Sequence, residues 1–428
     1  MAVWRRACVE LCRTVAGLLE ENGMWQTAAL ELFNDFSLIL YALTFDRDAD
    51  STSFDDLLRG PEYQRVIEKI LGRYPDLKEF NYEFGRGLGK LREEAWRELA
   101  AGFRVCAGEE QLRECGGEIF DYVLQSMYRK EQIGNFITPQ PLAELMADML
   151  EPKQGELVID PVCGCGRLLT AAAARCRDCR YIGNDLDGRI RTTAFFNMAF
   201  HGLRGAELYQ KDFLRGIWER EGDLILANPP YSDDIHETIR FLKKIMETLK
   251  TGARCGVLVP EGFLTNAANA QVIAMRRILT CRYSLEAVIS LPRKIYRPYT
   301  FSKSSLILLK KESPSPGHLT FFDSVAEYEG PENQFSDEAY GREMRRIAEA
   351  WKRWRQHGKA RVSGDDGFWA TSLEEIEAKG YVLGAEDYRK SGYEYVKPRR
   401  NQVWDDIFAG QNELERSALD YFREDSAI

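Results

Sequence analysis

The run Asn228-Pro229-Pro230-Tyr231 follows an apolar stretch at 223–227 and could bind an amino group. Its prolines lack backbone donors and stiffen the turn, so the amide oxygen of Asn228 and the carbonyl oxygen of Pro229 are expected to be free acceptors. Two acceptors can hold an NH₂ group and aim its lone pair for attack, while Tyr231 can stack on a planar base. A turn with a structural role alone would rarely combine these residue types directly after an apolar strand.

A second candidate site is the turn Asp160-Pro161-Val162-Cys163-Gly164-Cys165-Gly166, between a predicted strand at 157–159 and a helix predicted to begin near Arg167. Glycine lets the backbone turn tightly and lets a ligand come close. The N-terminus of a helix adds unpaired N–H groups and partial positive charge. The turn therefore suits a nucleotide-like cofactor, although the G-x-x-x-x-G-K-[ST] pattern of a phosphate-binding loop is absent.

Two acidic residues could complete such a cofactor site. Asp185 lies in Gly183-Asn184-Asp185-Leu186-Asp187, at the end of the next predicted strand. Its spacing from the glycine turn is one at which a carboxylate can accept both ribose hydroxyls. An alternative is that Asp185 or Asp187 caps the following helix. Asp212 comes later in the chain and could reach an adenine ring.

The elements that must position these residues alternate between short apolar strands and helical segments from about residue 155 onwards. The predicted strands are 157–159, 181–183, 224–227, 256–259, 285–289 and 305–309. This alternation predicts an α/β fold with a doubly wound, mostly parallel sheet and helices on both faces. The segment Ser313-Pro314-Ser315-Pro316-Gly317 either ends the sheet or joins two late strands.

Helical regions are predicted on both sides of the sheet. We expect a helical N-terminal domain at 1–125, a catalytic domain at 126–325 and a helical, partner-docking C-terminal region at 326–428. Within 342–361, an apolar stripe at helical spacing favours a packed helix over a DNA-binding one. The stripe consists of Met344, Ile347, Trp351 and Trp354. The apolar residues of 404–422 could equally dock on a partner or pack on this chain.

Composition limits the class of protein. The chain has 428 residues, with 58 Lys and Arg against 67 Asp and Glu, and a net charge of −9 at pH 7. This balance argues against a surface that binds nucleic acid everywhere, but it allows a local basic cleft. No apolar run is expected to reach the ~18 residues of a membrane helix, and the start lacks the apolar stretch of a secretory signal. We therefore expect a cytoplasmic protein that is not embedded in a membrane.

The ten cysteines are scattered along the chain. In a long cytosolic protein they are expected to be reduced, buried and small apolar residues. Cys176-Arg177-Asp178-Cys179 is one C-x-x-C pair, and no second pair follows it at the spacing of a zinc site. No metal site is predicted.

The glycine turn, Asp185 and Asn228-Pro229-Pro230-Tyr231, in this order, resemble the motifs of S-adenosylmethionine-dependent amino methyltransferases. More closely, the chain resembles the N6-adenine DNA methyltransferases that form the modification subunits of type I restriction–modification systems. The similarity covers roughly residues 115–390. Its further segments are Gly134-Asn135-Phe136-Ile137-Thr138-Pro139, Asn197-Met198 with His201-Gly202, Val259-Pro260-Glu261-Gly262-Phe263-Leu264, Ala287-Val288-Ile289-Ser290-Leu291-Pro292, and Leu373-Glu374-Glu375-Ile376 with Gly380-Tyr381 and Tyr388.

The resemblance implies S-adenosylmethionine as cofactor and methyl transfer to N6 of an adenine that is flipped out of DNA. The residues implied for the methionine end of the cofactor are Phe136, Thr138 and Pro139, and those for its amino acid part are Asp160, Cys163, Gly164 and Gly166. Asp185 would bind the ribose and Asp212 the adenine. The residues implied for the target base are Asn228, Pro229, Pro230 and Tyr231. The chain departs from the family at Cys165, where Thr or Ser is usual and a thiol is a weaker hydrogen-bond partner.

The resemblance also implies partners. Beyond the sheet we find no second α/β unit large enough to read several base pairs, so a separate specificity subunit is expected to recognise the DNA sequence. A restriction nuclease subunit and two copies of this chain per specificity subunit are further possibilities. A basic loop between two late strands could contact DNA through Arg293, Lys294, Arg297 and Lys303. The alternative for this loop is an ordinary solvated segment.

Two other functions are compatible with the same motifs. The first is an amino methyltransferase that acts on a protein glutamine or on RNA, which Asn228-Pro229-Pro230-Tyr231 alone would permit. The second is a non-catalytic, cofactor-binding scaffold in a defence complex. The complete motif at 228–231 favours catalysis over the scaffold.

Overall fold

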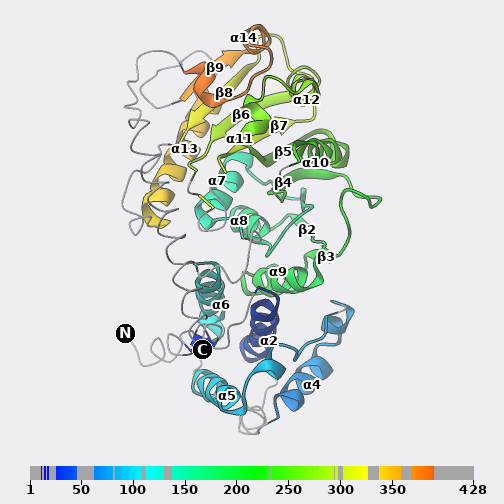
Figure 1. Cartoon of the computed structure of the whole chain (residues 1–428), viewed down its shortest axis with the longest axis vertical. Helices are drawn as coiled ribbons and strands as arrows, with labels where there is room; N and C mark the ends of the chain where they lie inside the picture. Colours follow the sequence, from blue (N-terminus) through cyan, green and yellow to red (C-terminus); the bar gives the residue numbers. More distant parts are fainter. Residues whose placement is uncertain are drawn as a thin grey trace, which may run out of the picture. The chain divides into compact units, whose positions relative to one another are not determined.

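The computed structural model describes residues 11, 14–15, 17–18, 26–45, 62–80, 82–107, 112–129, 137–230, 234–293, 295–296, 302–325, 337–357 and 368–389. Met1–Tyr388 form one compact unit. Figure 1 shows a helical part, here called the head, and a larger part built around a sheet.

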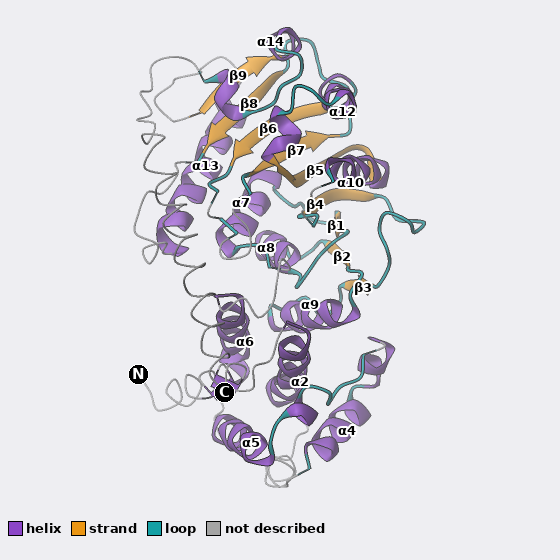
Figure 2. Cartoon of the chain, in the orientation of Figure 1, coloured by secondary structure: helices purple, strands orange, loops and turns teal. Residues whose placement is uncertain are grey.

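The sheet has nine strands in the order β3-β2-β1-β4-β5-β7-β6-β8-β9 (Figure 2). Neighbouring strands are parallel from β3 to β5, β7 is antiparallel to both its neighbours, β6 and β8 are parallel, and β9 is antiparallel to β8. The strands are Leu157–Asp160 (β1), Arg180–Asn184 (β2), Glu207–Tyr209 (β3), Gly222–Ala227 (β4), Leu249–Pro260 (β5), Ser284–Ser290 (β6), Ser304–Lys310 (β7), Leu319–Ser324 (β8) and Phe368–Ser372 (β9).

The strand order reverses between β1 and β4. From β1 the chain continues to β2 and β3 on one side, whereas β4 and β5 lie on the other side. Open α/β sheets bind ligands at the carboxyl ends of their strands, at the point of such a reversal. Asp160 is the last residue of β1 and Asn228 directly follows β4. The fold therefore brings the two main candidate motifs to the edge where a ligand is expected.

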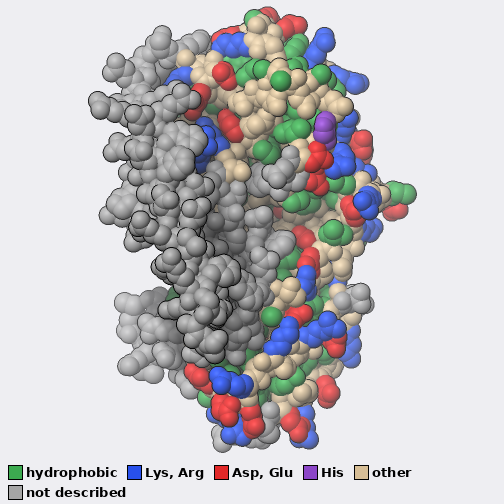
Figure 3. All heavy atoms as spheres, viewed as in Figure 1, with side chains coloured by type: hydrophobic (Ala, Val, Ile, Leu, Met, Phe, Trp, Pro, Cys, Tyr) green, Lys and Arg blue, Asp and Glu red, His purple; other side chains and the backbone are tan. Residues whose placement is uncertain are grey.

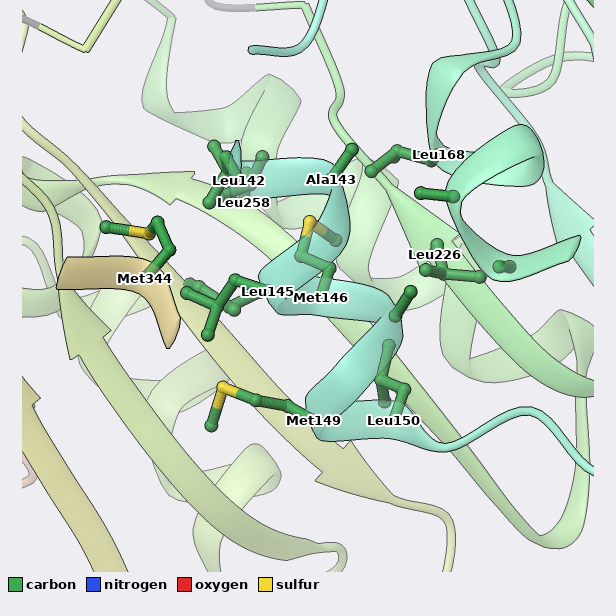
Figure 4. Close-up of a cluster of buried hydrophobic side chains, with 14 of the residues drawn as sticks. Leu142, Ala143, Leu145, Met146, Met149, Leu150, Leu168, Leu226, Leu258 and Met344 are labelled. Atoms are coloured by element: carbon green, nitrogen blue, oxygen red, sulfur yellow. The ribbon is translucent and has the colours of Figure 1, made fainter. Parts of the chain in front are cut away.

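Helices cover both faces of the sheet, so its strands are apolar on both sides. One face packs against α7 (Gln140–Leu150), α8 (Arg167–Arg175) and α13 (Asp337–His357). Figure 4 shows side chains of α7 meeting Leu226 of β4 and Leu258 of β5. The opposite face packs against α10 (Ile235–Thr248), α11 (Glu261–Thr265), α12 (Ala270–Cys281), α14 (Leu373–Ala378) and the short η5 (Ala385–Tyr388).

The doubly wound, mostly parallel sheet is confirmed, and all six predicted strands are present as β1, β2, β4, β5, β6 and β7. The Pro-rich segment at 313–317 joins β7 to β8, which decides between its two predicted roles. The strands β3 and β8 were not predicted. The strand β3 has three residues and pairs with β2, and β8 has six residues and pairs with β6 and β9. Segments this short carry little periodicity of their own.

The region after 325 is only partly the helical tail that the sequence predicts. The helix α13 is present, and its stripe residues Met344, Ile347 and Trp351 are buried against the sheet face, as predicted. The prediction of a helical region is wrong for 368–372, which form β9. Pairing with β8 stabilises this strand, and a contact with a distant strand is not visible in the local sequence. The segment 404–422 lies outside the described residues.

The head is helical, as predicted. Its elements are α2 (Gln26–Phe45), α4 (Tyr63–Arg73), η1 (Pro75–Phe80), η2 (Leu88–Lys90), α5 (Glu93–Ala107) and α6 (Leu112–Arg129). Their buried side chains share one hydrophobic cluster with Ile190, Phe196 and Ala199 of α9 (Gly188–Phe200). The helix α6 continues past the predicted domain boundary at 125, so head and sheet are not separated there.

The helix α2 contains a stretch, Thr27–Phe45, that is long and apolar enough to cross a membrane, which the sequence did not predict. Inside the protein 83% of its most apolar window is buried. Its polar residues bind neighbouring elements. Asn34 donates to the carbonyl of Arg189 at 2.9 Å and accepts from the Thr193 hydroxyl at 2.8 Å. These bonds and the shared apolar cluster identify α2 as the central helix of the head.

Candidate active site

The glycine turn joins β1 to α8, and its backbone needs glycine. Gly164 and Gly166 have φ of 54° and 79°, in the left-handed region that other residues rarely adopt. Gly166 also packs on α9, because a Cβ there would lie 3.2 Å from Met198 Cγ. The turn leads directly into the N-terminus of α8, and its N–H groups at Gly164 and Gly166 donate to Asp185 Oδ2 and to the Cys163 carbonyl.

Asp185 fixes this turn as well as facing the site. Its Oδ2 accepts from the N–H of Gly164 at 3.0 Å, and its Oδ1 accepts from the N–H of Asp187 at 2.9 Å. Asp187, not Asp185, caps α9, by accepting from the N–H of Arg189. Asp187 therefore has the capping role, and Asp185 stays the residue predicted to bind ribose.

Asp160 and Asp185 form a pair of carboxyls that resist ionisation. Burial raises the pKa of Asp160 well above its usual range, and the nearby Asp185 raises it further. Burial also raises the pKa of Asp185 to about 6, against the opposing effect of the N–H groups of Asp187 and Gly164. Negative charge is costly here, and a bound cation or hydrogen-bond donor would favour the ionised carboxyls.

Asn184 is a site residue that sequence analysis missed. It is 1% exposed, and its Nδ2 donates to the carbonyls of Pro161 at 2.9 Å and Lys211 at 3.0 Å. Its Oδ1 accepts from the N–H of Lys211 at 2.9 Å. One side chain therefore ties the glycine turn to the segment after β3. The signal in the sequence is a polar residue at the end of an apolar strand, beside Asp185.

Replacing Asn184 by alanine is expected to lower the free energy of unfolding by about 3 kcal/mol, because buried partners at Pro161 and Lys211 would lose their hydrogen bonds. Chemical denaturation of the full chain measures this change. Glu219→Ala, at an exposed position in the segment after β3, is the matched control and should change stability by less than about 0.5 kcal/mol. Equal stability of the two variants would contradict the bridging role.

Asn228 has one oxygen that lacks a partner. Its Nδ2 donates to the Thr138 hydroxyl at 3.1 Å, which orients the amide. Its Oδ1 is buried and accepts no hydrogen bond from the residues that the structure describes. A buried acceptor without a donor is costly and rare in folded proteins, and it marks a position that a ligand can satisfy. Pro229 is buried and Pro230 is exposed, whereas Tyr231 lies outside the described residues.

Other predicted cofactor residues are placed as follows. Thr138 is buried, Pro139 immediately precedes α7, and Phe136 lies outside the described residues. Asp212 lies just after β3, and its Oδ1 accepts from the N–H groups of Leu214 at 3.0 Å and Arg215 at 3.2 Å. This carboxylate therefore shapes its own turn, and its contact with adenine stays a prediction.

The cysteines of the turn are packing residues. Burial raises the pKa of Cys163 well above its usual range and that of Cys165 to about 11, so both are thiols. Cys165 belongs to the apolar cluster of the head, where it lies among residues such as Ile137 and Phe196. Among the described residues, no group of three or more His, Cys, Asp or Glu side chains could hold a metal ion.

The predicted DNA-binding cations are only partly described. Arg293 is exposed, while Lys294 and Arg297 lie outside the described residues. Lys303 Nζ lies 3.2 Å from Glu386 Oε1, with 14% of its side chain exposed. Lys303 therefore joins β7 to η5, which is a structural contact. On the described part of the face in Figure 3, basic and acidic side chains are interspersed.

Comparison with solved structures shows the fold. A chain from a type I R-M system, studied for complex assembly and conformational transition, is 20% identical with a TM-score of 0.68, covering 100% of this chain and 98% of that one. The type I restriction-modification methyltransferase subunit from Streptococcus thermophilus is also 20% identical, with a TM-score of 0.65 and coverage of 90% and 99%.

Sequence comparison shows related proteins at low identity. The type I restriction enzyme EcoEI methylase subunit of Escherichia coli is 24% identical over 238 residues, which cover 48% of each chain. The MjaVIII methylase subunit of Methanocaldococcus jannaschii is 24% identical over 353 residues, 72% of this chain and 58% of that one. This chain thus aligns with about half the length of these curated relatives.

The family model that matches is described as N-6 DNA Methylase and covers residues 112–395, which include the glycine turn, Asp185 and Asn228. The match extends over more than half of the chain, and it contains the whole of the sheet. The chain therefore belongs to the N-6 DNA methylase family.

Proposed function

We propose that this protein is a DNA methyltransferase that transfers a methyl group from S-adenosylmethionine to N6 of adenine. The observation that carries this proposal is the buried Oδ1 of Asn228 at the carboxyl end of β4, which has no donor among the described residues. An amino group is the donor that this acceptor lacks. Family membership and the neighbouring glycine turn supply the rest of the support.

The residues present fit the proposed cofactor. The Asp185 carboxylate offers acceptors for two ribose hydroxyls, and we assign the turn with Cys163, Gly164 and Gly166 to the amino acid part of the cofactor. Asp160 is a buried carboxyl whose pKa burial raises, and an ammonium group beside it would favour its ionised form. We assign Phe136, Thr138 and Pro139 to the methionine end, and Asp212 to the adenine. When bound, S-adenosylmethionine supplies an electrophilic methyl group on a sulfonium.

The chain's own residues account for the activation of the amino group. Adenine N6 inside a duplex is out of reach, so the base must rotate out of the helix. Asn228 Oδ1 and the Pro229 carbonyl then accept hydrogen bonds from the amino group, which hinders its lone pair from delocalising into the ring. Thr138 keeps the amide of Asn228 in the required orientation. Pro230 stiffens the turn and Tyr231 stacks on the base. Catalysis is mainly positioning.

The same proposal includes partners. A separate specificity subunit reads the DNA sequence in this proposal, which the similarity to type I methylase subunits supports. Of the basic loop, Arg293 and the cations Lys294 and Arg297 are assigned to DNA contact. The proposal also includes a nuclease subunit and a complex that contains two copies of this chain. It places the protein in the cytoplasm, where chromosomal DNA is accessible.

Sequencing that detects N6-methyladenine is expected to find one recurring methylated sequence in the native genome and none after deletion of the gene. Restoring the gene should restore the mark, whereas a copy with Asn228→Ala should not. A mark on RNA or protein, with unchanged DNA, would favour the alternative amino methyltransferases. Site-specific methylation by the isolated chain would contradict the need for a specificity subunit.

A further inference from the structure

The carbonyl of Cys165, in the glycine turn, is held by α9. Asn197 Nδ2 donates to this carbonyl at 2.7 Å, and Asn197 is 1% exposed. Gly166 packs on Met198 of the same helix, so the backbone of the turn is held against α9 at a second point. A Cβ at Gly166 would also lie 3.5 Å from Ala194 Cβ, and Ala194 is three residues before Asn197 and four before Met198, so these residues share one helix face.

The next contact leads from Asn197 to His201 at the end of α9. His201 Nδ1 lies 2.8 Å from the Asn197 carbonyl, so the ring must donate there. With Nδ1 protonated, Nε2 faces Asp121 Oδ2 at 3.2 Å. A neutral ring would present a lone pair to that carboxylate, whereas an imidazolium donates to both partners. The contact is therefore complete only when His201 is charged.

Asp121 belongs to α6 of the head, and α6 reaches the turn from a second side as well. Gln125 Oε1 accepts from Arg167 Nη1 at 3.4 Å, and Arg167 is the first residue of α8 after the turn. Phe120 packs against Phe200 with ring centroids 5.3 Å apart, which holds α6 on the end of α9. The head thus contacts both supports of the cofactor turn.

We propose that Asp121, His201 and Asn197 form a positioning relay through which the helical head sets the geometry of the cofactor turn. The inference rests on the proposed function and deepens it, because it makes cofactor affinity depend on the head. None of the three residues touches the reacting atoms. A movement of α6 changes the hydrogen bond from Asn197 Nδ2 to the Cys165 carbonyl. Because coupling between two sites is reciprocal, cofactor binding must favour the position of α6 in which Asp121 contacts His201.

The protonation of His201 supplies a readout that a purely structural contact would not give. The hydrogen bond from His201 to Asp121 raises the pKa of His201, while burial and the positive charge of Arg167 oppose this. Arg177 is a further cation next to Gly202. Since the folded pKa is raised, the relay is complete at lower pH and is lost as the pH rises through that pKa.

Calorimetry of S-adenosylmethionine binding to the full chain tests the relay. Asn197→Ala should weaken affinity about tenfold, because the buried Cys165 carbonyl loses its donor. Turnover at saturating cofactor should stay near that of the wild type, since Asn228 is untouched. His201→Gln, at an exposed position, should weaken affinity about threefold at pH 6.5 and remove the loss of affinity towards pH 8.5.

Two further variants complete the design. Asp121→Asn should move the loss of affinity to lower pH, and Glu118→Gln, an exposed carboxylate on the same helix, should behave as the wild type. Folded Asn197→Ala and His201→Gln chains with unchanged affinity and pH dependence would overturn the relay. A wild-type chain that binds no S-adenosylmethionine would overturn the proposed function itself, and the relay with it.

Discussion

Replacing Asn228 by alanine is expected to lower the turnover of methyl transfer by on the order of 10²- to 10³-fold, the usual effect of removing one pre-oriented polar group from an active site. Cofactor affinity should change by less than about twofold, because an interaction made only with the target base contributes to turnover and not to cofactor binding. Transfer of a labelled methyl group to DNA and calorimetry of cofactor binding measure the two effects separately.

The matched variant is Asn228→Asp, which keeps an acceptor of the same size and loses the Nδ2 donor to Thr138. If the unpartnered Oδ1 is what matters, this variant should retain clearly more turnover than Asn228→Ala. The Thr138 hydroxyl can then donate to the carboxylate and preserve its orientation. Turnover near the wild-type rate in Asn228→Ala would remove the main support for the proposed chemistry.

The same comparison separates chemistry from folding. Removing the side chain of Asn228 also removes a buried acceptor that has no protein donor in the described residues. Its loss offsets the loss of the bond from Asn228 Nδ2 to Thr138, so the free energy of unfolding should change by less than about 1 kcal/mol. A variant that is stable, binds cofactor and does not transfer methyl groups would place the defect at the amino group of the target base.

The part of the site that could be predicted from the sequence is the part encoded by short contiguous motifs. The turn from Asp160 to Gly166 and the run at Asn228 each follow an apolar strand, so their place at a strand's carboxyl end is readable locally. Their meeting at one edge follows from the parallel order of β1 and β4. Strand alternation already predicted such an order.

What could not be predicted depends on contacts between distant segments. The two bonds that Asn184 Nδ2 donates span more than twenty residues, and nothing in G-N-D-L-D says which carbonyls they reach. The strand β9 exists only because β8 lies beside it. Lys303 looked like a free cation in a basic loop, but Glu386 lies far along the chain and pairs with it. Tertiary packing decides all three.

Cofactor affinity is expected to fall as the pH drops from about 7 to about 5, because Asp185 has a pKa of about 6 and must be ionised to accept both ribose hydroxyls. Below that pKa each pH unit should cost up to about tenfold in affinity, since a proton competes with the ligand. Asp185→Asn should bind about 10- to 100-fold more weakly at pH 8, because charge-assisted hydrogen bonds are lost. Its affinity should lack this acid dependence.

Asp187→Asn is the matched control, since it changes the neighbouring carboxylate, which caps α9 and does not face the turn. It should keep the acid dependence, moved towards lower pH because the charge of Asp187 helps to raise the pKa of Asp185. Equal acid dependence in Asp185→Asn and the wild type would contradict the assignment of Asp185. Calorimetric titrations at a series of pH values decide between these outcomes.

The stability of the cofactor-free chain should change in the opposite direction. The pKa of Asp185 rises from 3.8 to about 6 on folding, so the folded chain holds the proton more tightly than the unfolded chain between these values. Stability therefore decreases as the pH rises through this window, by about 1–2 kcal/mol for a carboxyl that keeps some contact with solvent. The difference between wild type and Asp185→Asn isolates this contribution from that of Asp160, whose pKa is also raised. Ionised Asp185 thus destabilises the empty site and strengthens cofactor binding, as expected for a group whose charge is needed only when ligand is present.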